Sequence, residues 1–135
     1  MTQSQLPDFG QTHPVDLIQF ARNLAQSVES AAQRTAGDRA YYAAFLASRE
    51  FFAAKGYLTA TGSARDHQLV ALELRARGGN RLGNRLEQLR RARNKVTYEL
   101  TSLYSLGALG DRHVRPLSSM ITIAEEVMEG VTRIP

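Results

Sequence analysis

Apolar residues recur every three or four positions along most of the chain, which is the spacing of one face of an α-helix. The first such stretch begins at Thr12-His13-Pro14, because proline is tolerated at the first helical position. Its apolar positions are Leu17, Ile18, Ala21, Leu24, Ala25, Val28 and Ala31. No segment keeps the strict alternation of apolar and polar residues that a strand needs. The pattern therefore predicts an all-α protein.

Glycines and capping residues divide this pattern into separate helices. Gly37 is expected to interrupt the first helix, Asp38 to cap the second, and Gly56 to end it. The second helix carries a stripe of Tyr41, Phe45, Ser48 and Phe52. Residues 63–66, Ser-Ala-Arg-Asp, resemble a capping box and predict the start of a short helix. The apolar positions of that helix are Leu69, Val70, Leu72 and Leu74.

Two further breaks complete the predicted architecture. Residues 78–80, Gly-Gly-Asn, precede the longest helix, which is expected over 81–106, and Gly107, Gly110 and Asp111 mark the next turn. The last helix has one apolar face, made of Val114, Leu117, Ile121, Ala124, Met128 and Val131. Short connections favour an up-and-down bundle of four main helices plus one short helix. We expect a flexible leader over 1–11 and a single helical domain over 12–132.

Composition narrows the class of protein. A chain of 135 residues, 43% of them hydrophobic and 22% charged, is expected to be one globular domain. It has no cysteine, which excludes disulfides, thiolate metal sites and cysteine nucleophiles and permits a reducing cytosol. We expect a cytoplasmic protein, because the first ten residues do not resemble a signal peptide and no apolar run approaches the roughly 20 residues of a membrane span. The three histidines lack metal-ligand spacing, so neither a metal nor another cofactor is expected.

One residue breaks the pattern of the long helix. Positions spaced alternately by four and three from Leu82 are all apolar except Arg93; the others are Leu82, Leu86, Leu89, Val96, Leu100 and Leu103. A guanidinium in an apolar stripe must be paired or must line a cleft, because an unpaired buried charge is costly. Three interpretations stay open: an ion pair with a carboxylate such as Asp38 or Glu50, a side chain that reaches water at the edge of the stripe, and a functional site.

Positive charge is concentrated on and just before the same helix. The basic residues there are Arg75, Arg77, Arg81, Arg85, Arg90, Arg91, Arg93 and Lys95, with Glu87 as the single acid among them. Such runs usually form a solvated helix face, but arginine also binds phosphate with two parallel hydrogen bonds. The run is therefore a candidate surface for an RNA or nucleotide backbone, with an acidic protein as the alternative partner.

Three segments together resemble a small stand-alone HEPN domain (higher eukaryotes and prokaryotes nucleotide-binding). Residues 38–45, Asp-Arg-Ala-Tyr-Tyr-Ala-Ala-Phe, resemble its second-helix segment, and residues 66–70, Asp-His-Gln-Leu-Val, resemble the start of its middle helix. Residues 93–98, Arg-Asn-Lys-Val-Thr-Tyr, resemble its late-helix signature. The resemblance spans about residues 14–130 with the segments in the expected order.

The resemblance implies a helical bundle that often dimerises and acts on RNA. Many members of the family are ribonucleases of toxin–antitoxin, CRISPR or anti-phage systems, and others pair with a minimal nucleotidyltransferase. Ribonuclease members carry arginine, then four to six residues, then histidine. Arg93 and Asn94 match the start of that motif, but Tyr98 stands at the histidine position. Arg93, Asn94 and Tyr98 are accordingly the candidate catalytic residues.

The tyrosine matters for the chemistry. Cleavage of RNA without a metal needs one group that takes a proton from the 2′-hydroxyl and another that protonates the leaving oxygen. Histidine suits both roles, whereas tyrosine, with a pKa of about 10, is a poor base at neutral pH. Arg93 and Tyr98 also lie about 140° apart around a helix, so a compact site forms more easily where two copies meet across a two-fold axis. We therefore predict a homodimer.

Further candidates surround this motif. Arg39 and Tyr42 are three apart on the second helix and either border the Arg93 site or serve as an ion-pair and a core residue. His67 either replaces the missing general base, or it caps the helix or makes a structural hydrogen bond. Arg85, Arg90 and Lys95 are candidate nucleic-acid contacts. The expected ligand is RNA or a nucleotide; the alternative is a non-catalytic dimer that binds a nucleotide or holds a nucleotidyltransferase or another antitoxin-like partner.

Overall fold

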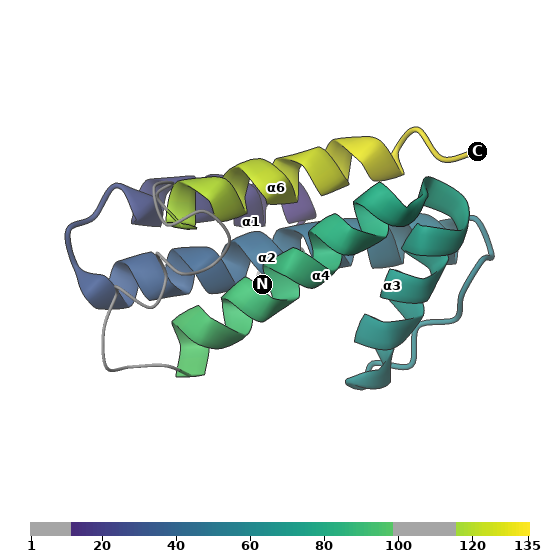
Figure 1. The fold of residues 1–135 in the computed structure, drawn as a ribbon, viewed down its shortest axis with the longest axis horizontal. Coiled ribbons are helices and arrows are strands. Elements are labelled where there is room, and N and C mark those ends of the chain that lie inside the picture. The colour runs from purple at the N-terminus through teal and green to yellow at the C-terminus, as the bar shows by residue number, and fades with distance from the viewer. Residues whose placement is uncertain (1–11, 99–115) are drawn as a thin grey trace, which may run out of the picture.

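The computed structural model describes residues 12–98 and 116–135, and within them the chain forms helices and no strand. The helices are α1 (Pro14–Ala25), α2 (Ser30–Ala54), α3 (Arg65–Gly78), α4 (Asn80–Tyr98) and α6 (Pro116–Val131). In Figure 1, α1, α2 and α6 lie along the length of the molecule, α4 runs obliquely to them, and α3 lies at one end. The prediction of an all-α helical bundle is confirmed. The leader over 1–11, the turn at Gly107–Asp111 and the end of the helix predicted over 81–106 lie outside the described residues.

The boundary predicted between the first two helices is wrong. The first helix begins at Pro14 as expected but ends at Ala25, and α2 already begins at Ser30. Val28 is 95% exposed and Ala31 is exposed, so neither belongs to an apolar face. The predicted break at Gly37 and cap at Asp38 lie instead in the interior of α2, which is 25 residues long.

Gly37 lies inside a helix because Val96 of α4 and Met120 of α6 pack against it. A Cβ placed there would lie 3.0 Å from Val96 Cγ2 and 3.2 Å from Met120 Sδ. Glycine in a helix interior costs about 1 kcal/mol relative to alanine. The missing side chain lets α4 and α6 approach α2 closely, and this packing offsets that cost.

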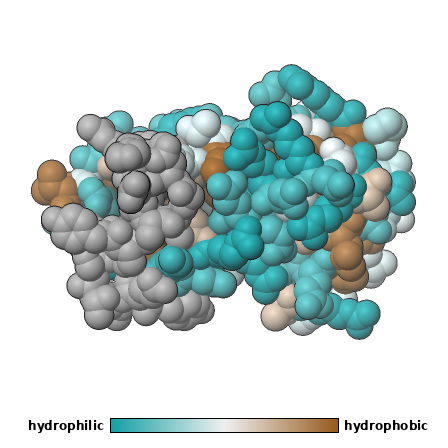
Figure 2. Space-filling view, in the orientation of Figure 1, coloured by the Kyte–Doolittle hydropathy of each residue, from teal (hydrophilic) through white to brown (hydrophobic). Residues whose placement is uncertain are grey.

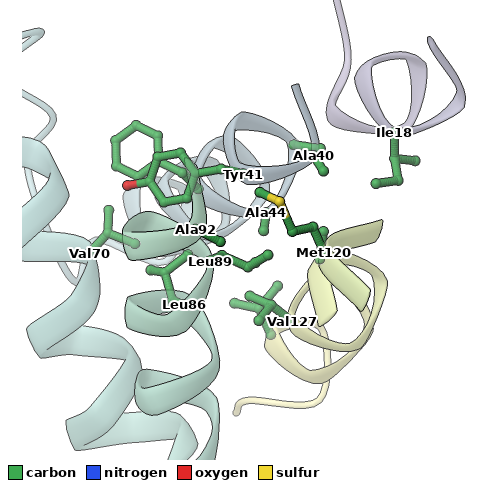
Figure 3. Packing of buried hydrophobic residues seen from close by; sticks show 14 of the residues in the cluster. Ile18, Ala40, Tyr41, Ala44, Val70, Leu86, Leu89, Ala92, Met120 and Val127 are labelled. Atoms are coloured by element: carbon green, nitrogen blue, oxygen red, sulfur yellow. The ribbon is translucent and has the colours of Figure 1, made fainter. Parts of the chain in front are cut away.

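The core lies where α2 meets the other helices. The predicted stripe is confirmed, since Tyr41, Phe45, Ser48 and Phe52 are all buried. Alanines of α2, including Ala40 and Ala44, face Met120 of α6 in Figure 3, and their small side chains leave room for it. Figure 3 also shows the Tyr41 hydroxyl pointing away from these alanines, on the side of α3. The core therefore ends in a polar group where α2 faces α3.

The start of α3 differs from the predicted capping box. The Asp66 carboxylate is 1% exposed and accepts hydrogen bonds from the backbone N–H groups of Thr61 (2.9 Å) and Gly62 (3.0 Å), not from that of Ser63. The Ser63 N–H donates to Thr61 Oγ1 at 3.2 Å. Asp66 thus closes the turn before the helix. Arg49 of α2 lies 3.5 Å from the same carboxylate and ties this turn to the core.

Asp66 makes the fold sensitive to acid. The hydrogen bonds from Thr61, first that of its hydroxyl and then that of its backbone, hold the pKa of the Asp66 carboxyl below its usual value. Its contribution to stability is therefore complete above the ordinary aspartate pKa of about 3.9 and is lost as the pH falls through the lower pKa of the folded state. We expect Asp66→Asn to be less stable at neutral pH and to lose less stability than the wild type between pH 5 and pH 3, values chosen to bracket about 3.9.

Urea unfolding across this pH range measures the effect. Glu50→Gln is the matched control, because exposed Glu50 contacts the same Arg49 side chain at 3.3 Å. Parallel pH profiles for Asp66→Asn and the wild type would show that the carboxylate has no such role.

Candidate functional site

Arg93 lies between α4 and α2 and has polar partners there. Its Nε donates to Asp38 Oδ1 at 2.9 Å, and the two side chains are 20% and 19% exposed. Its Nη2 donates to the Tyr42 hydroxyl at 3.3 Å, and its Cζ lies 5.2 Å from the centre of the Tyr42 ring. Of the two carboxylates considered from the sequence, Asp38 is the partner. The guanidinium is therefore half-buried in the apolar stripe and held in a defined direction.

The neighbours of Arg93 include other predicted site residues. Asn94 is exposed, and its Oδ1 accepts a hydrogen bond from Arg93 Nη1 at 3.3 Å. Arg39 is paired as well, with its Nη1 3.4 Å from Asp38 Oδ2. Tyr42 therefore borders the Arg93 site, which was one alternative for this pair of residues. Arg39 forms an ion pair with an acid, which was the other. Tyr98 is the last residue of α4, and its side chain lies outside the described part of the structure.

His67 lies in the first turn of α3 and packs into an aromatic cluster of α2. Its ring stacks on Phe45 with centroids 4.2 Å apart and meets Tyr42 edge-on at 6.1 Å. Its Nδ1 shares a hydrogen bond with the Tyr41 hydroxyl. The structural hydrogen bond expected as one alternative is therefore present. Tyr42 contacts both His67 and Arg93. The three segments that resemble a HEPN domain (38–45, 66–70 and 93–98) therefore meet at this ring.

The surroundings keep His67 and Tyr41 uncharged at neutral pH. Burial lowers the pKa of His67 most, and the positive charges of Arg90 and Arg93 lower it further, while Asp66 opposes them. Burial raises the pKa of the Tyr41 hydroxyl well above its usual value. The pair is a neutral phenol and a neutral imidazole beside two arginines.

The basic run divides into two parts. Arg77 pairs with Glu73 at 2.7 Å, and Arg81 and Arg85 both pair with Glu126 of α6, at 2.9 and 3.3 Å. Farther along α4, Arg90, Arg91 and Lys95 make no ion pair with any residue that the structure describes. In Figure 2, the coloured centre of the face that carries α4 is mostly hydrophilic. The uncompensated positive charge therefore lies in the half of α4 that holds Arg93.

Sequence reasoning missed two members of this region. The apolar stripe predicts Tyr41 only as a core residue, whereas its hydroxyl shares a hydrogen bond with His67 Nδ1. Arg34 is the second: its Nη1 donates to the Val96 carbonyl at 3.0 Å, and it lines a hollow of about 360 Å³ with Thr35, Asp38 and Arg39. The spacing of four between Arg34 and Asp38 on one helix was the available signal, because such residues share a face.

No protein family, curated protein or solved structure matches this chain. Within residues 12–98 and 116–135, no three histidine, aspartate or glutamate side chains gather where they would hold a metal ion. None of the helices described here is long and apolar enough to cross a membrane. The fold and site define an all-α bundle with an arginine-centred polar site between α2 and α4; the resemblance to HEPN domains stays a prediction.

Proposed function

We propose that this protein is an RNA-directed module of the HEPN type in which Arg93 holds a backbone phosphate. The observation that carries the proposal is the half-buried Arg93 guanidinium, oriented by Asp38 and Tyr42. A guanidinium held in place loses less freedom when it binds a phosphate than a mobile one does. Arg90 and Lys95 on the same helix have no ion pair among the described residues, and their positive charge favours an anionic ligand.

The reaction implied by the resemblance is RNA cleavage without a metal, in a toxin or defence protein. The 2′-oxygen forms a bond to the adjacent phosphorus, the bond from phosphorus to the 5′-oxygen breaks, and the proton lost by the 2′-hydroxyl is balanced by one gained by the leaving oxygen. Arg93 would stabilise the charge on the phosphate in the transition state. Asn94 would position the substrate, and Tyr98 or His67 would handle the protons.

A second function is a non-catalytic HEPN-type dimer that binds a nucleotide or holds a partner nucleotidyltransferase. The hydrogen bond between Tyr41 and His67 favours it, because Nδ1 of His67 is already engaged by Tyr41 and cannot exchange a proton with a substrate unless that contact breaks. Tyr98 is a poor base at neutral pH, with an ordinary pKa of about 10. Light scattering on the purified protein tests the proposed homodimer.

One experiment separates the two functions. Purified protein is incubated with tRNA and total RNA in EDTA, and the products are analysed for cyclic-phosphate and 5′-hydroxyl ends. Such ends, formed by the wild type and lost with Arg93→Ala, support the ribonuclease. Absence of cleavage together with binding of a nucleotide supports the second function, and a chain that neither binds nor cleaves RNA contradicts the RNA-directed module.

The division of the basic run predicts the salt dependence of RNA binding. Arg90→Ala and Arg91→Ala are each expected to lower the slope of log affinity against log salt by about 0.7, the value for one contact with single-stranded nucleic acid. Arg81→Ala is the control, because Arg81 is already paired with Glu126 at 2.9 Å. Fluorescence anisotropy at several salt concentrations measures the slopes. Equal losses in all three variants would mean that the paired half of the run binds RNA equally.

A further inference from the structure

The direction of the hydrogen bond between Tyr41 and His67 follows from burial. The Tyr41 side chain is 1% exposed, and among the described residues its hydroxyl has one partner, His67 Nδ1. A buried hydroxyl must use its hydrogen, because an unsatisfied buried donor is costly. Since burial also raises the pKa of this phenol, it keeps that hydrogen. Tyr41 therefore donates, and Nδ1 of His67 accepts.

This direction determines the form of the imidazole. A neutral histidine that accepts at Nδ1 carries its proton on Nε2. Stacking on Phe45 at 4.2 Å and edge contact with Tyr42 hold the plane of the ring. The charged and titratable groups around His67 include Tyr41, Tyr42 and Arg49 of α2, Asp66 of α3, and Arg90 and Arg93 of α4. Among the described residues, no group makes a hydrogen bond with Nε2.

We propose that Tyr41 is a positioning residue that presents His67 as a neutral Nε2–H donor, and that this donor binds a phosphate oxygen of RNA beside Arg90 and Arg93. The inference rests on the proposed function and narrows it, because His67 then contributes a hydrogen bond and does not act as the general base. A phosphate is the ligand that fits, since the two arginines supply positive charge around a donor that is itself uncharged. Bound phosphate would offset their repulsion and raise the pKa of His67.

The binding test compares two substitutions at the same position. His67→Ala is expected to weaken the binding of a single-stranded RNA oligonucleotide about tenfold, the effect of one hydrogen bond to a charged group. His67→Gln is expected to keep most of the affinity, because its amide still donates a hydrogen bond but cannot act as a base. Equal weakening by both substitutions would overturn the role of His67 as a donor.

The role of Tyr41 is tested in the free protein. Long-range ¹H–¹⁵N NMR spectra are expected to show His67 with its proton on Nε2 in the wild type. In Tyr41→Phe, which keeps the ring but lacks the hydroxyl, the form with the proton on Nδ1 should appear. Exposed His13 is the internal control, and its spectrum should not change. A wild-type His67 with its proton on Nδ1 would overturn the inference.

RNA binding tests the proposed function, and the NMR spectra of His67 test the role of Tyr41 separately. A wild-type protein that does not bind the oligonucleotide contradicts the proposed function and the phosphate contact together, whereas the NMR spectra still decide whether Tyr41 orients His67. RNA binding that leaves the pKa of His67 unchanged contradicts the phosphate contact alone. Thermal unfolding of each variant shows that it is folded before binding is compared.

Discussion

Arg93→Ala is expected to lower RNA cleavage at least about a hundredfold, the usual effect of removing one preorganised donor from a developing negative charge. RNA affinity should fall as well, because the phosphate loses a guanidinium contact. Arg93→Lys should recover part of the affinity but little of the cleavage, since lysine keeps the charge and loses the planar set of donors. Gel analysis of labelled RNA and anisotropy measure the two effects.

The control for this result is Asp38→Asn. Both variants break the same ion pair, in which Arg93 Nε lies 2.9 Å from Asp38 Oδ1, so both are expected to lose some stability. Their effects on RNA affinity should nevertheless be opposite, because Asp38→Asn removes a negative charge next to the proposed phosphate and keeps a side-chain oxygen that can accept from Arg93 Nε. If both variants lost RNA affinity in proportion to their loss of stability, Arg93 would be a structural residue and not a ligand-binding one.

Phe52→Ala is expected to have the largest effect on stability, with a loss of about 3–5 kcal/mol in the free energy of unfolding. Phe52 is fully buried near the end of α2, where its ring meets those of Phe51 and Tyr57 at centroid distances of 6.0 and 6.4 Å. Removing it leaves a cavity that the surrounding helices fill only in part. Urea unfolding monitored by circular dichroism measures the change.

Phe20→Ala is the matched control, because this phenylalanine on α1 is 48% exposed. Its loss should cost clearly less than that of Phe52, since little apolar surface returns to water. A similar loss of stability for both variants would mean that the Phe20 side chain packs more tightly than its exposed fraction indicates. The folded fraction of Phe52→Ala should still bind RNA, because Phe52 is not among the residues that contact Arg93 or His67.

Local pattern predicted the helices well and their boundary at Gly37 wrongly. A helical period is a property of neighbouring positions, so the buried stripe from Tyr41 to Phe52 was readable from the chain. Glycine is a helix breaker only on average, and its acceptance here depends on Val96 and Met120, which lie far away in sequence. Because the sequence predicts a helix end at Gly37, it also predicts that Asp38 is a helix cap, whereas Asp38 lies in the interior of α2.

The same division holds for the candidate site. The sequence by itself determined that Arg93 interrupts an apolar stripe on a basic helix, because both the stripe and the charge run are local. Only the tertiary structure decided that Asp38 and not Glu50 is its partner, that Tyr41 bonds His67, and that Arg81 is paired while Arg90 has no ion pair with a described residue. These pairings depend on how the helices cross and which side chains come within a few ångströms, and spacing along one helix does not determine either.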